Sequence, residues 1–80
     1  MCVKLEDSSN VIVTDVMIKV LDNEFNKFVR KIYVYNVKEL KKIENNKVEL
    51  IMKNENSIIF NFKDEKNKAL FIEKLNIYLI

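Results

Sequence analysis

Residues 47–63 read KVELIMKNENSIIFNFK and lead directly into DEKNKALFIEKLNIYL at residues 64–79. Apolar side chains occupy every second position of two segments within the first stretch, 47–53 and 57–63, which is the spacing of a strand with one buried face. The alternating apolar residues are Val48, Leu50, Met52, Ile58, Phe60 and Phe62. The polar sequence Asn54-Glu55-Asn56 separates the two segments. We therefore predict a β-hairpin whose inner face is wholly apolar.

The stretch after the hairpin has the signals of an amphipathic helix. Asp64 is suited to cap the first turn, and Glu65 stands where the helix dipole favours a negative charge. Apolar residues then recur at helical spacing: Phe71, Leu75, Tyr78 and Leu79, with Ile72 at the margin. The pattern predicts a helix over about 64–79 that lies across the sheet.

Upstream segments rich in valine, isoleucine and aromatic residues predict further strands at 3–6, 10–21 and 25–37. Residues 38–44 fit either a strand or a helical turn, and we favour a short strand that leads into an Asn45-Asn46 turn. With no glycine in the chain, asparagine is the residue best able to adopt left-handed turn conformations. The expected fold is α+β or mainly β: a curved antiparallel meander of five or six strands, a partial barrel, with one C-terminal helix in a single domain, 1–80.

Residue types exclude most kinds of chemistry. Cys2 is the only cysteine and histidine is absent, so neither an internal disulfide nor an ordinary zinc site is expected. We expect Cys2 to be a bland surface thiol. A phosphate-binding loop needs glycine, which is missing. The carboxylates Asp15, Glu49 and Glu73 are scattered, so we expect no catalytic residue, no cofactor and no metal.

The chain has an ordinary globular composition and a net charge of +2, too small to indicate a nucleic-acid or membrane binder by itself. No apolar run approaches the roughly 20 residues of a membrane span. One unpaired thiol fits a reducing compartment, which predicts a cytoplasmic protein, or one in the host-cell cytoplasm if the source is a virus. Thirteen lysines against one arginine are typical of an AT-rich genome, such as that of a low-GC bacterium, its phage or some archaea.

From Lys31 onwards the chain resembles the C-terminal part of pleckstrin-homology-like (PH-like) domains. The matching features are the strand at 32–37, the spacing of Leu40 and Ile43, the hairpin at 47–62 and the capped helix after Asp64. The resemblance implies a binding scaffold. Such domains usually have seven strands, and those that bind phosphoinositides carry basic residues in and beside the first loop. The corresponding loop here, 6–10, is acidic, so lipid binding is not implied.

A second apolar stripe on the predicted helix indicates a contact with another chain. Leu70 and Ile77 lie away from the Phe71 and Leu75 face, and a helix with one buried face would leave both in water. The hypothetical partner interface consists of Leu70, Ile77, Ile80, Ile51 and Ile59. The alternative is that the helix lies in a deep groove or that these single exposed residues are tolerated.

One strand mixes bases with aromatics in a way that is typical of single-stranded nucleic-acid platforms. The residues concerned are Arg30, Lys31, Tyr33 and Tyr35. In the alternative interpretation, which we favour, the two tyrosines pack under the C-terminal helix.

The sequence thus predicts a small non-catalytic protein–protein interaction module, as a homodimer or an adaptor subunit, that binds through the helix stripe or a free sheet edge. Two alternatives stay open. The first is a phage- or virus-encoded inhibitor that masks a host protein, and the second is a nucleic-acid-binding domain.

Overall fold

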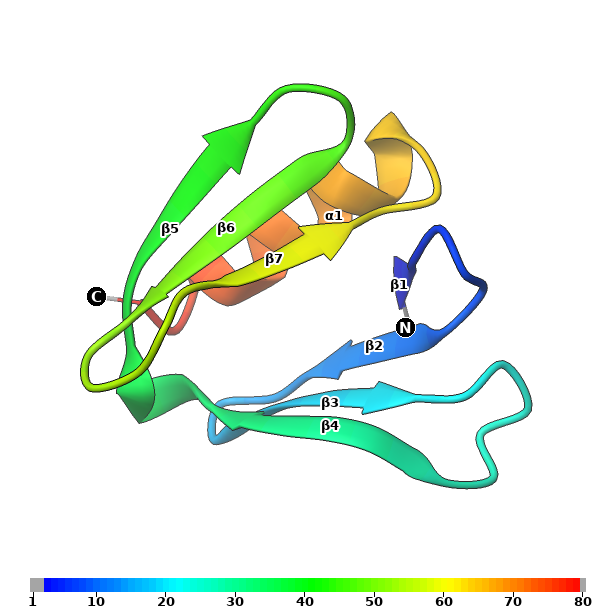
Figure 1. The fold of residues 1–80 in the computed structure, drawn as a ribbon, viewed down its shortest axis with the longest axis horizontal. Coiled ribbons are helices and arrows are strands. Elements are labelled where there is room, and N and C mark those ends of the chain that lie inside the picture. The colour runs from blue at the N-terminus through cyan, green and yellow to red at the C-terminus, as the bar shows by residue number, and fades with distance from the viewer. Residues whose placement is uncertain (1–2, 80) are drawn as a thin grey trace.

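A computed structural model describes residues 3–79. Within these residues seven strands, one short 3-10 helix and one α-helix follow one another (Figure 1). They are β1 (Val3–Lys4), β2 (Asn10–Val13), β3 (Met17–Leu21), β4 (Phe28–Tyr33), η1 (Val34–Asn36), β5 (Val37–Ile43), β6 (Lys47–Met52), β7 (Ile58–Asn61) and α1 (Glu65–Asn76). The antiparallel meander with a C-terminal helix is confirmed, with seven strands where we expected five or six.

The strands form two antiparallel sheets, one in the order β1-β2-β3-β4 and the other in the order β5-β6-β7. The sheets meet at one corner, where Glu6 N donates to Asn61 O and Lys63 N donates to Lys4 O. At the other corner η1 carries the chain from β4 into β5. The two sheets do not close into a barrel, so β4 remains at an edge of its sheet.

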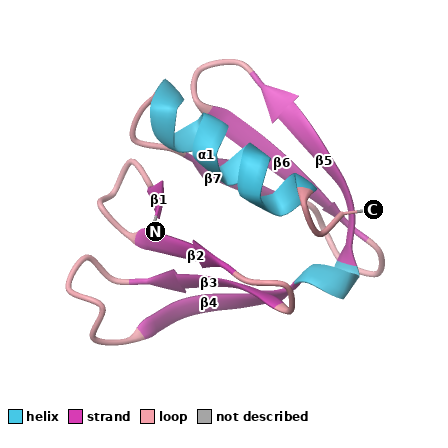
Figure 2. Ribbon diagram, turned by 180° about the vertical axis from the view of Figure 1, so that it is seen from behind, coloured by secondary structure: helices cyan, strands magenta, loops and turns pink. Residues whose placement is uncertain are grey.

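The core lies between the sheets and α1, which crosses the β5-β6-β7 sheet (Figure 2). The Phe71 ring contacts those of Phe60 and Phe62, with centroids 5.5 and 5.0 Å away. Phe71 and Leu75 are fully buried, as the helical spacing predicts. The hairpin residues predicted to face inward from β6 are buried as well: Val48, Leu50 and Met52.

The predicted strand over 10–21 is wrong in one respect, because it is a hairpin. Thr14 turns the chain: its Oγ accepts hydrogen bonds from Val16 N at 3.3 Å and Met17 N at 3.0 Å, and its N–H donates to Met17 O. A threonine hydroxyl can stabilise a turn without glycine, proline or asparagine. Periodicity alone therefore gave no sign of this break.

The predicted strand over 25–37 is also divided. Residues 22–27 form a loop in which Asp22 Oδ1 accepts from Glu24 N and Asn26 N, and Val34–Asn36 turn as η1. Residues 37–43 are strand β5, which confirms the favoured interpretation of 38–44. Asn45 and Asn46 adopt φ values of 61° and 64°, as expected of asparagines that replace glycine in a tight turn.

The helix is capped as predicted but is shorter. Asp64 Oδ1 accepts from Asn67 N at 2.9 Å, and Asn67 Oδ1 accepts from Lys4 N, which ties the helix start to β1. The helix ends at Asn76 rather than near 79, since Tyr78 N and Leu79 N both bond to Leu75 O and tighten the last turn.

Acid is expected to weaken the fold through two turn carboxylates. The backbone N–H of Asn67 lowers the pKa of Asp64, and that of Ser9 lowers the pKa of Asp7, both from about 3.8. As pH falls through that value the unfolded chain takes up these protons first, so this stability is present above pH 4 and lost as pH falls through the folded pKa values. Urea denaturation at pH 6 and pH 3 checks this. Asp64→Asn should flatten the difference, and an unchanged difference in both Asp64→Asn and Asp7→Asn would contradict it.

Candidate interaction surface

Strand β4 is poorly covered by the rest of the fold. Of its six residues only Ile32 is buried. Five of the nine large apolar side chains left exposed among residues 3–79 lie between 25 and 35. They are Phe25, Phe28, Val29, Tyr33 and Tyr35. All five lie on β4 or next to its ends, and clusters of exposed apolar side chains commonly mark interaction sites.

A β-bulge determines which β4 side chains share a face. Leu21 is opposite Phe28 but Val20 is opposite Arg30, so Val29 is the additional residue. The bulge moves Phe28 onto the same face as Lys31, whose Nζ lies 4.4 Å from the centre of the Phe28 ring. Arg30 remains on the side of the buried Ile32.

The outer edge of β4 offers free backbone groups. Val34 N donates to Val16 O at 2.9 Å, and this bond identifies which residues of β4 form hydrogen bonds with β3. Because antiparallel pairing alternates in steps of two, Ile32 and Arg30 direct their backbone groups to β3. The N–H and C=O groups of Lys31 and Tyr33 therefore point away from β3, along an edge that no described strand covers.

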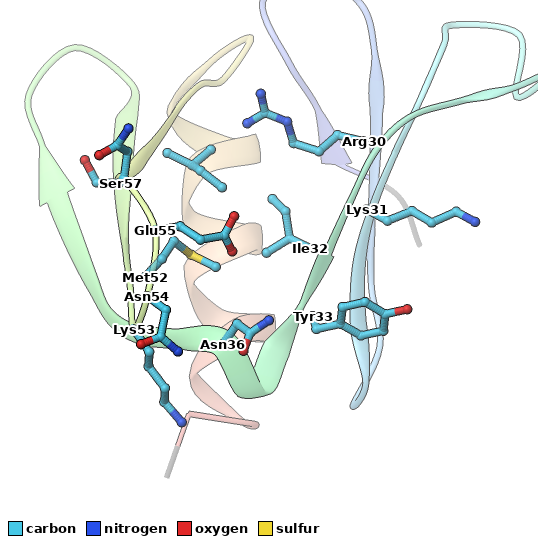
Figure 3. Close-up of a pocket in the computed structure, with 12 residues that line it drawn as sticks. Arg30, Lys31, Ile32, Tyr33, Asn36, Met52, Lys53, Asn54, Glu55 and Ser57 are labelled. Atoms are coloured by element: carbon cyan, nitrogen blue, oxygen red, sulfur yellow. The ribbon is translucent and has the colours of Figure 1, made fainter.

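A cleft of about 850 Å³ separates this edge from the β6-β7 turn (Figure 3). Its apolar lining comes from Ile32, Met52 and Ile58. Arg30 and Glu55 point into the space from opposite walls, while Lys31 and Tyr33 point away from it on the outer face. Arg30 and Glu55 are thus the charged lining residues whose side chains are directed into the space, whereas Lys31 and Lys53 border it and point outwards. The cleft combines a strand edge and an apolar floor with one cation on the β4 wall and one carboxylate on the opposite wall.

The interface predicted around the helix is not one continuous surface. Leu70 is half-buried and packs against the core, whereas Ile77 lies beyond the end of α1 and is 60% exposed. Ile51 and Ile59 belong to the outer face of the β5-β6-β7 sheet, where Ile59 is exposed. Ile80 and Cys2 lie outside the described residues.

The basic and aromatic residues predicted as a nucleic-acid site lie near one another in the structure. Arg30, Lys31 and Tyr33 all line the cleft. The Tyr33 and Tyr35 ring centroids are 5.3 Å apart. The expectation that the tyrosines pack under the helix is wrong, because they are 42% and 64% exposed. Tyr33 is the last residue of β4, and Tyr35 lies in η1, where it lines a shallow cleft together with Tyr78 and Leu79 from the segment after α1.

Sequence reasoning missed the cleft residues of the β6-β7 turn, which lie 20 or more positions from β4 along the chain. The carboxylates predicted to be scattered are Asp15, Glu49 and Glu73, and Glu49 accepts a hydrogen bond from Ser57 Oγ at 2.6 Å. No group of three or more metal-binding side chains occurs within residues 3–79, and no helix there is long and apolar enough to cross a membrane.

No protein-family model matches this chain, and comparison with curated proteins finds no significant relative.

Proposed function

We propose that this protein is a non-catalytic interaction module that binds a partner protein by adding one of its strands to the free edge of β4. The observation that carries the proposal is the coincidence of unpaired backbone groups at Lys31 and Tyr33 with an apolar-floored cleft beside them. Main-chain hydrogen bonds give such strand addition its affinity, and pockets for alternate side chains give it specificity.

Two further features support this proposal. Phe25 has φ = 60°, a conformation that costs a bulky residue about 1–2 kcal/mol, and about half of its surface is exposed. A strained and exposed aromatic residue is hard to explain by folding alone, and a partner contact would explain it. The absence of histidine and glycine supports a non-catalytic role, and the lone cysteine supports a cytoplasmic one.

We also propose that the scaffold is PH-like. Seven strands followed by a C-terminal helix support the resemblance, since the smaller number expected from the sequence was a departure from that family. The acidic loop at 6–10 remains a reason to expect protein binding rather than phosphoinositide binding.

A proline at the edge of β4 tests the proposal. In Lys31→Pro the lost N–H points away from β3, so the ladder stays intact while one bond to an added strand is removed. Tagged protein is incubated with a lysate of the cells in which it occurs, and retained proteins are quantified. We expect at least one protein to be retained by the wild type and lost, by about tenfold or more, with Lys31→Pro.

The matched control is Lys42→Pro. In the β6-β7 ladder the backbone groups of Glu49 and Ile51 point away from β7 and towards β5, where these residues pair with Lys41 and Glu39. Lys42 directly follows Lys41 in the alternation of the strand, so its N–H points to the outer edge of β5. Circular dichroism of both variants establishes that they are folded. Identical sets of retained proteins for the wild type and both variants would rule out binding at β4.

A second candidate function is single-strand nucleic-acid binding on the outer face of the same strand. Lys19 and Lys31 stand directly opposite each other there, beside the exposed Tyr33 and Tyr35. Phosphate contacts lose affinity steeply as salt rises, whereas stacking alone does not. The affinity for a fluorescent mixed-sequence single strand is measured by titration, and we expect it to fall by at least tenfold between 50 and 200 mM salt. The double variant Lys19→Gln with Lys31→Gln should bind about as weakly as the wild type does at the higher salt concentration. Binding that is absent, or indifferent to both changes, would remove this candidate.

A further inference from the structure

The cleft beside β4 also carries information on the chemistry of its occupant. This inference rests on the proposed strand addition and concerns what the added strand must contain. The relevant features are the charges on β4, the alternation of side chains along a strand and the position of the apolar floor.

A second copy of this chain is a poor occupant for the edge. The Lys31 and Tyr33 backbone groups point outwards, so a two-fold antiparallel pairing of β4 strands must be centred on a single residue. Registers centred on Arg30 and on Lys31 each set a charge directly opposite its own copy, an arrangement that destabilises strand pairs. The register centred on Ile32 avoids this, but it pairs only three residues of β4, from Lys31 to Tyr33, because Val34 begins η1. Lysines at sheet edges commonly prevent such self-pairing.

The same charges favour an acidic strand from another protein. Opposite charges facing each other across a strand pair stabilise it. Arg30 points into the cleft, and a guanidinium can bind a carboxylate through two parallel hydrogen bonds. Lys31 points away from the cleft, so Arg30 is the cation that a carboxylate on the cleft side of the added strand would face, with Glu55 on the opposite wall.

The apolar floor of the cleft determines where the added strand must place an apolar side chain relative to its acidic one. Arg30 and Ile32 are on the same side of β4, two positions apart, and Ile32 meets Met52 and Ile58 at the floor. Side chains of an added strand also alternate in steps of two. A residue facing Ile32 and one facing Arg30 are therefore separated by one residue that points away from the cleft.

We propose that the occupant is an extended segment of a different protein, paired antiparallel with β4, in which an apolar residue is followed two positions later by aspartate or glutamate. In the antiparallel direction the chain passes Ile32 before Arg30, which gives this order. The intervening side chain faces outwards beside Lys31 and Tyr33, where it is not restricted by the cleft.

Selection from a displayed library of random twelve-residue peptides on the wild-type protein tests this chemistry. We expect the enriched peptides to share an apolar residue and an acidic residue two positions later. The same selection on Arg30→Glu should favour lysine or arginine at the second position. Enrichment without an acidic preference would overturn this inference and leave strand addition in place, whereas no enrichment over Lys31→Pro would overturn both.

Defined peptides then test the geometry. The most enriched peptide is labelled, and its affinity is measured by fluorescence anisotropy. When the acidic residue of the peptide is replaced by its amide, the peptide should bind the wild-type protein about tenfold more weakly. The Arg30→Gln protein should bind the acidic and the amide peptide equally well. N-methylation of the backbone nitrogens of the peptide that face β4 should abolish binding without any change to the protein. Equal affinity of the acidic and amide peptides would overturn the inference.

Nucleic acid is the competing occupant in this experiment. An unlabelled mixed-sequence single strand is added to the peptide complex at the same salt concentration. We expect no displacement at concentrations that saturate peptide binding. If the nucleic acid displaces the labelled peptide at a lower concentration than the unlabelled peptide does, the residues around the cleft bind phosphate, and the inference is overturned.

Discussion

Replacement of Phe71 by alanine is expected to lower the free energy of unfolding by about 3–5 kcal/mol. The Phe71 side chain is fully buried, and it joins α1 to the β5-β6-β7 sheet through the rings of Phe60 and Phe62. Its removal leaves a cavity that surrounding side chains from two different elements cannot easily fill. A domain of this length has about 4–12 kcal/mol of total stability, so the variant should be near the limit of folding.

Urea denaturation followed by circular dichroism measures this effect. Phe71→Leu is the matched control, because it keeps much of the apolar volume and should cost clearly less than alanine. A loss below about 1 kcal/mol for Phe71→Ala would mean that the helix does not close the core as described.

The second large effect is expected at Leu70, which the sequence indicated as part of an exposed stripe. Leu70 packs against the core, so Leu70→Glu places a charge where an apolar side chain is half-buried. We expect it to lower the free energy of unfolding by about 2 kcal/mol. Ile77→Glu is the natural comparison, because Ile77 is exposed beyond the end of α1. Its effect should stay within about 0.5 kcal/mol.

The same denaturation experiment distinguishes the two variants. Equal, small effects of Leu70→Glu and Ile77→Glu would restore the outer stripe as a surface on which both residues are free. A large effect of Ile77→Glu would instead show that residues after Asn76 belong to the folded core. Either result would change the surface available to a partner at this end of the molecule.

The β4 surface shows why function was harder to predict than fold. Phe28, Val29 and Tyr33 have the composition of a buried strand, and the sequence gives no sign that they are left in water. Their exposure follows from the position of β4 at the edge of its sheet and from the bulge at Val29. The cleft needs in addition the β6-β7 turn, which the fold brings to the opposite wall.

By itself the sequence determined the strand alternation of 47–63, the asparagine turn at 45–46 and the cap at Asp64, because each depends on neighbours a few residues away. The turn at Thr14 and the early end of α1 are held by hydrogen bonds between residues at most four positions apart, so they are local features that the apolar spacing does not mark. Tertiary structure alone decided the division into two sheets and the exposure of β4. These depend on which elements pack together and which edge is left without a neighbour, and such long-range contacts have no local pattern in the chain.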